Sequence, residues 1–390
     1  MKEVRVAIVG GGPSGLQAAI ALSRLGVKPT VYEEHSNVGQ PIQCGEGLSI
    51  HAFNDFSIPM EKSEIWTKVH KQCKLVFPEN GVIYGDIHAY MIQRDKFDQY
   101  LANRAKNLGS TIITSTKVNS IQQKTEGVIL HTEGEKPDKI QCELAIIAEG
   151  AKAKLTRNLD FKPPDPLIFA FEYKVEGEWG EDLEFYFDAE KYPYGYIWIF
   201  PRKNETNIGI VTTSSERKRR LDDFLKQKSI TGKILEKVGG PIPMKGPIPR
   251  IHRDNVMIVG DAAGMVNPIF YGGIRIGMTS GEIAGKVVAA FLKNQGEERT
   301  YSLSNYQIEL SKFKFMDKIN LSCHDFFYSR SNKFLSKLGK ILNNQNINKI
   351  EGKEKIKVLA NLTMNPDLLK YPRGLLKIYK GFKIARDWGF

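Results

Sequence analysis

The residues with the clearest chemical use lie near the start of the chain, where Gly10, Gly12 and Gly15 follow the pattern GxGxxG. Gly10 permits a tight turn, Gly12 lets the backbone approach a pyrophosphate, and Gly15 lets a helix pack closely on a strand. The N–H groups at the start of that helix, around Ser14, would face the phosphates. Glu33 stands 23 residues after Gly10, a spacing that suits a carboxylate meeting a ribose hydroxyl. Together these residues predict a dinucleotide site.

A second group of residues favours FAD as that dinucleotide. Asp261 follows an apolar strand at 256–259, where its carboxylate can accept a hydrogen bond from the ribityl chain of a flavin. The backbone of Gly272, Gly273 and Ile274 opens a helical stretch, so its N–H groups can face the electron-rich edge of the ring. Arg94 opens another helix and can pair with a phosphate. Glu34 is the alternative to Glu33 as the ribose ligand.

Cys44 lies in a loop that is rich in glycine, with Gly39, Gly45 and Gly47 around it. Such a loop can pass close to a flavin, because glycine leaves room for the backbone. Two interpretations stay open. Cys44 is either a small buried side chain that touches FAD only through its backbone, or a thiol poised over the substrate.

Aromatic residues recur at every second position between residues 192 and 200, namely at Tyr192, Tyr194, Tyr196, Trp198 and Phe200. In a strand this period places all five on one face. The face can be the ordinary core of a sheet, or it can roof an apolar channel above the flavin. The sequence predicts antiparallel strands at 167–175, 183–188, 194–200 and 206–211.

The elements that must position these residues indicate an α/β fold. Short apolar runs at 4–9, 27–32, 144–148 and 256–259 read as buried parallel strands, and helices are expected at 16–25 and 274–292. We therefore predict a Rossmann-type FAD-binding domain from residues 1–160 with 245–295. An antiparallel-sheet substrate domain is expected at 161–244, with part of 50–90, and a helical C-terminal region at 296–390.

Composition excludes several other classes of protein. The 390 residues are 41% hydrophobic and 26% charged, so the chain is long and apolar enough for a sizeable core. A stretch of about 20 apolar residues that could span a bilayer is lacking, and the first residues alternate like a strand rather than a secretory signal. The four cysteines form no CxxC and the seven histidines have no ligand spacing, so no metal site is predicted. A reduced cytoplasmic location is expected.

The net charge of +12 is concentrated in the last ninety residues, which hold 17 Lys+Arg against 7 Asp+Glu. These basic residues stand among apolar ones at Leu375, Leu376, Tyr379, Phe382, Trp388 and Phe390. The mixture favours peripheral association with an anionic membrane surface. The alternative is a set of helices packed on the body with lysines in water. No module for binding nucleic acid is recognised.

On these residues the sequence resembles the FAD superfamily of p-hydroxybenzoate hydroxylase, through GGGPSG, Glu33, Arg94 and the Gly260-Asp261 turn. Within it, Cys44-Gly45-Glu46-Gly47-Leu48 and Tyr196-Ile197-Trp198-Ile199-Phe200-Pro201 resemble the geranylgeranyl reductases, including archaeal digeranylgeranylglycerophospholipid reductases. The resemblance covers about residues 1–290. Three positions depart from the superfamily pattern: Glu149 stands where Asp is usual, Ala153 where Ser is common, and Tyr271 where Gly is common.

The resemblance implies an FAD-dependent oxidoreductase that reduces isoprenoid C=C bonds, such as the geranylgeranyl chains of archaeal-type ether lipids or a related prenyl substrate. Reduced flavin would supply hydride and a nearby acid the proton. It assigns catalytic roles to Cys44, Tyr196 and Trp198, and substrate contacts to Tyr194, Tyr196, Trp198 and Phe200. The expected FAD contacts are Gly10, Gly12, Ser14, Gly15, Glu33, Cys44, Gly45, Gly47, Arg94, Val118, Asp261, Gly272, Gly273 and Ile274.

Two other functions stay open at this point. The same FAD motifs serve flavin monooxygenases or epoxidases that act on a lipid or aromatic substrate. A prenyl-binding escort protein without flavin is the third possibility, and the intact glycine motif and Asp261 argue against it. The electron donor is not specified by the sequence: ferredoxin, NADPH or another donor would serve, since no second GxGxxG stands in a strand context.

Overall fold

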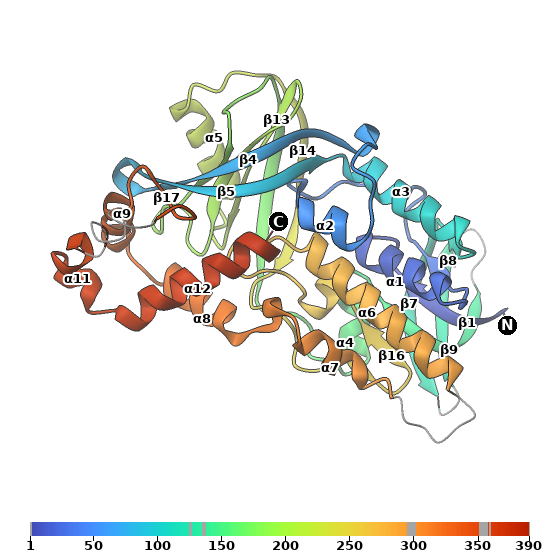
Figure 1. Ribbon diagram of the computed structural model, residues 1–390. Coiled ribbons are helices and arrows are strands. Elements are labelled where there is room, and N and C mark those ends of the chain that lie inside the picture. The colour runs from blue at the N-terminus through green and yellow to red at the C-terminus, as the bar shows by residue number, and fades with distance from the viewer. Residues whose placement is uncertain are drawn as a thin grey trace.

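The structure is a computed structural model that describes residues 2–124, 127–134, 138–294, 302–350, 358 and 360–389. Two sheets lie side by side and helices cover them (Figure 1). The blue N-terminal strand belongs to the first sheet, and the red C-terminal helices pack on the second. This is the α/β architecture that the sequence predicts.

The first sheet carries the glycine motif. Its strands are β1 (Lys2–Val9), β2 (Thr30–Tyr32), β6 (Thr111–Ile113), β7 (Thr116–Lys124), β8 (Gly127–Gly134), β9 (Lys139–Ile147), β15 (His252–Arg253) and β16 (Val256–Ile258). They lie in the order β15-β16-β9-β1-β2-β6, and β7 and β8 extend the sheet from β9. The pairs β1–β2, β1–β9, β9–β16 and β2–β6 are parallel. In open sheets of parallel strands, ligands bind at the carboxyl ends of the strands. The glycine turn and Glu33 lie at this end of the first sheet.

Three helices pack on this sheet: α1 (Pro13–Arg24), α3 (Arg94–Asn107) and α6 (Ile274–Lys293). Helices α1 and α6 cross closely because α6 presents glycines to α1. A Cβ on Gly281 would lie 2.1 Å from the carbonyl oxygen of Ser14, and one on Gly285 would lie 2.7 Å from that of Ala18. The crossing therefore joins the N-terminal motif to a segment about 270 residues later in the chain.

The second sheet is mostly antiparallel. Its strands are β3 (Gly47–Ser49), β4 (Trp66–Phe77), β5 (Gly81–Ile92), β10 (Leu167–Glu176), β11 (Leu183–Tyr186), β12 (Tyr196–Pro201), β13 (Glu205–Thr212), β14 (Ile234–Pro243) and β17 (Gln345–Asn346). Their order is β14-β10-β13-β12-β11-β4-β5-β17, with β3 beside β5. The pairs β11–β4 and β17–β5 are parallel, whereas β10 to β13 pair antiparallel as the sequence predicts. Strand β14, which the sequence analysis does not predict, pairs antiparallel with β10.

The start of the aromatic strand differs from the prediction. Strand β12 begins at Tyr196 rather than at 194, because Tyr194 has a positive φ of 60° and Gly195 closes a turn with its N–H on the Tyr192 carbonyl. Tyr192 packs with Ile197 and Ile199 on the opposite face of the strand. The prediction that all five aromatic residues share one face is therefore wrong for Tyr192 and Tyr194.

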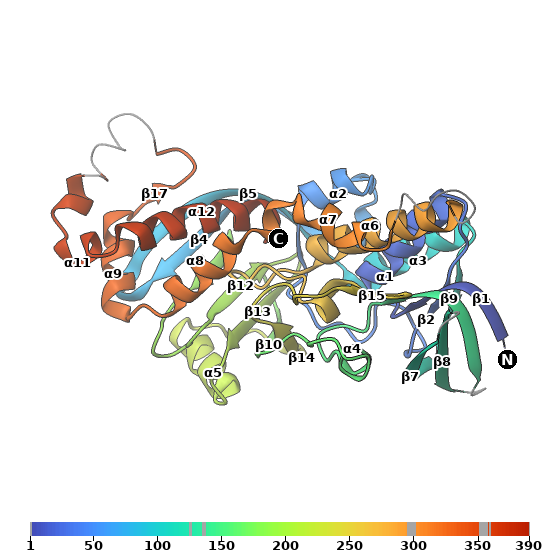
Figure 2. The same cartoon turned by 90° about the horizontal axis from the view of Figure 1, so that it is seen from below.

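Helices cover both faces of the second sheet (Figure 2). Helix α5 (Arg217–Gln227) packs on one face through Leu221, Phe224 and Leu225. The other face packs against α8 (Lys318–Tyr328), α9 (Asn332–Ile341) and α12 (Pro372–Trp388) through an aromatic core. The remaining helices are α2 (Ile50–Asp55), α4 (Lys154–Asn158), α7 (Asn305–Ser311) and α11 (Pro366–Leu369).

The C-terminal helices pack more closely than the sequence suggests. Leu376 and Tyr379 are exposed, but Phe382 joins the aromatic core, and Trp388 lies beneath the guanidinium of Arg275 at 3.9 Å. Phe390 lies outside the described residues. Within the described part of the chain, the structure contains no helix whose length and apolar character would suffice to cross a bilayer.

Candidate active site

The three motif glycines occupy different environments at the carboxyl end of β1. Gly10 has a φ of +107°, and a Cβ there would lie 2.2 Å from the carbonyl oxygen of Ala148. A Cβ on Gly15 would lie 2.1 Å from the carbonyl oxygen of Gly10. Gly12 is extended, with φ −76° and ψ 177°, and its Cβ would meet nothing within 4 Å. None of the described residues therefore occupies the space beside Gly12, which fits a pyrophosphate approaching the backbone.

Gly12 is also the N-cap residue of helix α1, and no side-chain hydrogen bond among the described residues caps this helix end. The free N–H groups of the first turn, together with the helix dipole, favour an anionic group there. The hydroxyl of Ser14 lies on the other side of the turn, close to Gly260 and Gly277 of the α1–α6 crossing. The side chain of Ser14 thus belongs to helix packing, and only its backbone is placed for a phosphate.

A cleft of about 560 Å³, here called the nucleotide-side cleft, opens beside this turn. It is lined by Gly10, Gly11, Gly12, Glu33, Arg94, Val118 and neighbouring residues. Glu33 is 8% exposed, and its Oε2 accepts the N–H of Gly11 at 2.7 Å. Glu34 also lines the cleft, but its carboxylate is half exposed and pairs with Lys117 at 3.2 Å. The buried position of Glu33 is better suited to hold a ribose.

Arg94 stands in the first turn of α3, as the sequence predicts. Its guanidinium binds the buried carboxylate of Asp98 with two hydrogen bonds, at 3.0 and 2.8 Å. A bidentate pair of this kind fixes the plane of the guanidinium. Arg94 is therefore held rigidly in the lining of the nucleotide-side cleft, with the Cys44 loop close by.

A second cleft of about 400 Å³, here called the flavin-side cleft, contains the other predicted segments. Its lining includes Cys44, Gly45, Gly47, Tyr196, Trp198, Phe200, Asp261, Gly272, Gly273 and Ile274. Six residues line both clefts, namely Glu34, His35, Pro41, Glu149, Gly150 and Lys152. The two clefts thus adjoin, which provides an extended site for a molecule with a nucleotide at one end and a flavin at the other. Tyr194 lies outside the lining of the flavin-side cleft.

Asp261 and the start of α6 form one end of the flavin-side cleft. Asp261 lies in the short 3₁₀ turn Gly260–Ala263, and burial raises its pKa to about 6 although Arg94 opposes this. A Cβ on Gly273 would lie 3.1 Å from Oδ1 of Asp261, so a glycine keeps that carboxylate accessible. Gly273 caps α6, a helix of 20 residues without a capping side chain. Its positive end favours a ring edge that carries negative charge.

Tyr271 explains one departure from the superfamily pattern. Its φ of +55° lies in the left-handed region, where glycine is preferred. The tyrosine is held there because its hydroxyl donates to the carbonyl oxygen of Tyr194 at 2.7 Å. Its ring stacks on that of Tyr196, with centroids 6.3 Å apart, and both rings line the flavin-side cleft. Glu149, the second departure, caps α4 by accepting from the N–H groups of Leu155 and Thr156.

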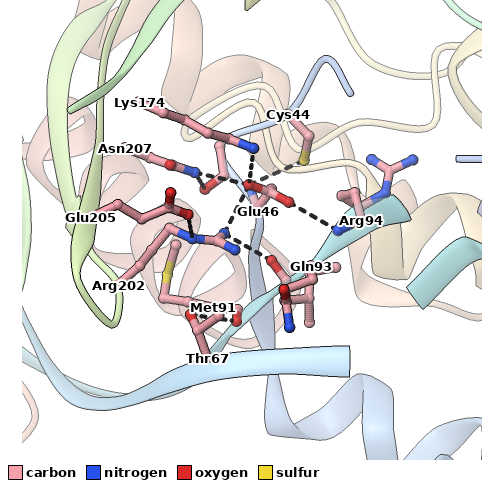
Figure 3. Close-up of polar contacts among 12 residues, drawn as sticks. Cys44, Glu46, Thr67, Met91, Gln93, Arg94, Lys174, Arg202, Glu205 and Asn207 are labelled. Carbon is pink, nitrogen blue, oxygen red and sulfur yellow. Dashed lines mark hydrogen bonds and ion pairs between the residues drawn. The ribbon is translucent and has the colours of Figure 1, made fainter. Parts of the chain in front are cut away.

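The Cys44 loop is fixed by the buried carboxylate of Glu46 (Figure 3). Glu46 is 1% exposed and has a φ of +65°. Its Oε2 accepts from Arg202 at 2.8 Å and from Asn207 at 3.2 Å, and pairs with Lys174 at 3.3 Å, while Oε1 accepts the N–H of Arg94 at 2.9 Å. These bonds join strands of the second sheet to the start of α3. The loop is therefore held rigidly between the two sheets.

The side chain of Cys44 faces the same network. Its Sγ accepts the N–H of Glu46 at 3.2 Å. Burial raises the pKa of the thiol above its ordinary value, although Arg94 opposes the rise. Cys44 is therefore a neutral thiol at neutral pH, placed in the lining of the flavin-side cleft.

Tyr196, Trp198 and Phe200 form an aromatic wall on one face of β12. All three are buried and line the cleft, whereas Ile197 and Ile199 pack on the opposite face. The indole lies flat on the next strand because its register partner is Gly209, whose Cβ would lie 2.1 Å from the ring. The indole N–H donates to Oε2 of Glu172 at 3.0 Å.

Two buried acids of the site, Glu46 and Glu172, have roles that the sequence interpretation missed. Glu172 lies in β10 and lines the flavin-side cleft at 2% exposure. A signal for it existed in the alternation of charged and apolar residues from 172 to 175, which places Glu172 and Lys174 on one face of the strand. Glu46 stands inside the recognised Cys44 motif, but its partners come from distant strands.

The family comparisons agree with this geometry. A family model described as the geranylgeranyl reductase catalytic domain matches residues 171–242, which include the aromatic wall and Glu172. A second, described as pyridine nucleotide-disulphide oxidoreductase, matches residues 3–160, which include the glycine motif and Glu33. The clefts, the open space at Gly12 and the acceptor Asp261 fit FAD as the bound dinucleotide. The chain is an FAD-dependent oxidoreductase.

Similar proteins extend over nearly the whole chain. A digeranylgeranylglycerophospholipid reductase of Methanococcus vannielii is 30% identical, covering 95% of this chain and 98% of the relative. Digeranylgeranylglycerophospholipid reductase 2 of Methanopyrus kandleri is 29% identical over 96% of this chain and all of the relative. A crystal structure of a geranylgeranyl bacteriochlorophyll reductase-like protein from Thermoplasma acidophilum matches with a TM-score of 0.82 at 24% identity, covering 94% of this chain and all of that one. The chain belongs to the digeranylgeranylglycerophospholipid reductase family.

Proposed function

We propose that this protein reduces isoprenoid C=C bonds in the geranylgeranyl chains of archaeal-type ether lipids or of a closely related prenyl lipid. One observation carries the proposal. The aromatic wall of Tyr196, Trp198 and Phe200 lines the same cleft as Asp261 and the α6 terminus, where a flavin fits. An apolar wall facing a flavin suits a hydrocarbon substrate.

The residues around the cleft would orient the substrate and exclude water. Bound FAD, when reduced, supplies a hydride. An isolated alkene is unactivated, so the protein must hold its carbons close to the hydride source in a dry site. Tyr196 and Trp198 provide the apolar surface, and Cys44 stands at the edge of the cleft on a rigid loop. We assign the substrate contacts to Tyr196, Trp198 and Phe200.

The test is mass spectrometry of lipids from cells that express the protein beside a pathway for unsaturated ether lipids. The expected result is a series of products that each gain two hydrogens per reduced bond. A matched strain with Gly12→Val provides the control, because this substitution should remove FAD without crowding the chain. Oxygen uptake with gain of oxygen atoms in the lipid would instead identify a monooxygenase or epoxidase and overturn the proposal.

We also propose that α12 rests on an anionic membrane surface. Its exposed positions follow helical spacing and combine basic with apolar side chains, among them Arg373, Leu376, Tyr379, Lys380, Lys383 and Arg386. Leu376 and Tyr379 are 50% and 65% exposed. Apolar side chains in a basic helix face suit insertion among headgroups of negative charge. The helix ends near the flavin-side cleft, since Gly389 lines it, so docking would bring the lipid close to the site.

A further inference from the structure

Glu172 is a buried acid in the flavin-side cleft that the function proposed above leaves without a role. Its Oε2 accepts the indole N–H of Trp198 at 3.0 Å. Its Oε1 is fully buried and has no hydrogen-bond partner among the described residues. A buried carboxylate oxygen without a partner is costly, whereas a neutral carboxylic acid is much less so. The geometry therefore favours a proton on Oε1.

The charged groups around Glu172 favour the same state. Lys174 and Arg202 are the nearby cations, and Glu46 lies between them, 3.3 Å from Lys174 and 2.8 Å from Arg202. Lys174 also pairs with Glu236 at 3.1 Å, and Arg202 with Glu205 at 2.9 Å. Two cations thus face three carboxylates before Glu172 is counted. Burial, followed by the charge of Glu46, raises the pKa of Glu172 well above its ordinary value.

Two tyrosine hydroxyls of the cleft are engaged in hydrogen bonds. The hydroxyl of Tyr196 donates to the carbonyl oxygen of Phe270, and that of Tyr271 to the carbonyl oxygen of Tyr194. Asp261 lies beside Gly273 at the α6 terminus, where the ribityl chain is expected. Glu172 lies beside the aromatic wall and the Cys44 loop: a Cβ on Gly45 would be 3.6 Å from its Oε2 and 3.5 Å from the indole nitrogen.

We propose that Glu172 is the general acid of the reaction, an assignment that rests on the proposed reduction of alkenes. Reduction of one C=C bond requires two electrons and two hydrogens. The hydride from reduced FAD forms a C–H bond at one carbon. The O–H bond of Glu172 breaks, and its proton forms a C–H bond with the alkene π electron pair at the other carbon. The resulting carboxylate still accepts the hydrogen bond from the indole N–H of Trp198, and a proton from solvent restores the carboxylic acid.

The first test detects the proton itself and needs no turnover. Infrared difference spectra between the wild-type holoprotein and Glu172→Gln should contain the carbonyl band of a protonated carboxylic acid at neutral pH. Gln keeps an oxygen for the indole N–H and the same side-chain size, so the fold should persist. A difference spectrum with carboxylate bands in place of the acid band would overturn the assignment.

The second test measures turnover with a geranylgeranyl ether lipid. Glu172→Gln should keep stoichiometric FAD, its melting temperature and its reduction by dithionite, while kcat falls at least about 100-fold with KM little changed. Wild-type turnover should fall as pH rises through the pKa of Glu172, because only the acid form donates. Glu176→Gln, on the exposed end of the same strand, is the control and should match wild type.

The outcomes separate the two proposals. A wild-type protein that binds FAD but does not reduce the lipid contradicts the proposed function, and the assignment to Glu172 fails with it. A wild type that reduces the lipid, with Glu172→Gln equally fast, contradicts only the assignment. Equal losses of FAD and turnover in Glu172→Gln would make Glu172 a structural residue and would also overturn it.

Discussion

At the scale of single residues, the glycine motif divides its work between folding and binding. Gly10 and Gly15 are required by the chain, since a side chain at either position would collide with backbone within about 2 Å. Gly12 is in an ordinary extended conformation with open space around it. Replacing a glycine of this motif is therefore expected to disturb the fold at Gly10 or Gly15, but to disturb FAD binding at Gly12.

Gly12→Val should yield a folded but colourless protein. A Cβ at this position has no atom of the described residues within 4 Å, so the unfolding temperature of the FAD-free protein should stay within a few degrees of that of FAD-free wild type. The isopropyl group would occupy the space of the pyrophosphate. Flavin absorbance and thermal unfolding measure the two effects. Gly15→Ala is the contrasting variant, which should unfold early; stoichiometric FAD in Gly12→Val would refute the phosphate position.

The pKa of Asp261 makes stability depend on pH. Its folded pKa of about 6 exceeds its ordinary value of 3.8, so the folded state binds the proton more tightly than the unfolded state. Ionised Asp261 therefore costs up to about 3 kcal/mol above pH 6, and the cost vanishes below about pH 4. In FAD-free protein, Asp261→Asn should gain stability over wild type between these limits. Urea unfolding at pH 4.5 and 7.5 tests this, and an equal difference at both would contradict it.

The aromatic wall should matter for substrate more than for flavin. Trp198→Leu keeps an apolar side chain of smaller volume, but it removes the ring that lines the cleft and the hydrogen bond to Glu172. We expect full FAD content and about tenfold weaker reduction of long isoprenoid chains, since a loss of about 1.4 kcal/mol of contact is a factor of ten. Ile199→Ala, on the opposite face of β12, should lower stability without this selectivity. Parallel losses of flavin and activity in Trp198→Leu would place the ring in the structural core.

The sequence predicts residues well where their role is local. Gly12 and Glu33 are found at the carboxyl edge of the first sheet because they follow the parallel strands β1 and β2, and Arg94 lines the same cleft because it opens α3. Glu46 and Glu172 could not be assigned in this way. Their environment depends on Arg202, Asn207 and Trp198, which come from strands 26 to 161 residues away.

At the scale of elements, the α1–α6 crossing reverses the usual effect of glycine in a helix. Gly281→Ala in an exposed helix would gain about 1 kcal/mol. Here the methyl group would lie 2.1 Å from the carbonyl oxygen of Ser14, and overpacking costs about 1–3 kcal/mol or more. We expect a lower unfolding temperature and weaker FAD binding, because α1 shifts with the crossing. A variant as stable as wild type would show that the helices separate easily.

Helix α12 should bind vesicles through charge. Replacement of Arg373, Lys380 and Lys383 by Gln should weaken binding to acidic vesicles about 100-fold, since each contributes about 1 kcal/mol. Gln at Lys71, Lys106 and Lys139, exposed on other elements, removes the same charge and should have little effect. Salt should release the wild type, because the Debye length shrinks to about 3 Å at 1 M. Co-sedimentation with vesicles measures this binding. Equal binding to neutral and acidic vesicles would contradict the proposal and make α12 an ordinary solvated helix.

Element boundaries show where sequence patterns stop being sufficient. A period of two from 192 to 200 predicts a longer strand than the β12 that forms, because the left-handed conformation of Tyr194 interrupts the extended backbone. The period persists on both sides of the break, so the pattern alone cannot reveal it. Helix α6, by contrast, follows its apolar pattern closely, from Ile274 to Lys293.

At the scale of the whole molecule, the Glu46 network connects the second sheet to α3, a helix that packs on the first sheet. Arg202 follows β12 and donates to Glu46 and to the carbonyl oxygen of Ile92 at the end of β5, both at 2.8 Å. The division that we propose, 1–160 with 245–295, 161–244 with part of 50–90, and 296–390, thus places the site where two domains meet. Such a location is common for ligand sites.

The crossing of α1 with α6 also has a consequence for biosynthesis. The ribosome makes the glycine turn and α1 early, but α6, the helix that packs against α1, ends only at Lys293. Domains generally fold as units while the chain emerges, and this unit stays incomplete until its distant segment has been made. During synthesis, the N-terminal strand β1 and helix α1 therefore emerge before α6, on which α1 packs. We therefore expect firm capture of FAD only by a chain whose synthesis has passed α6.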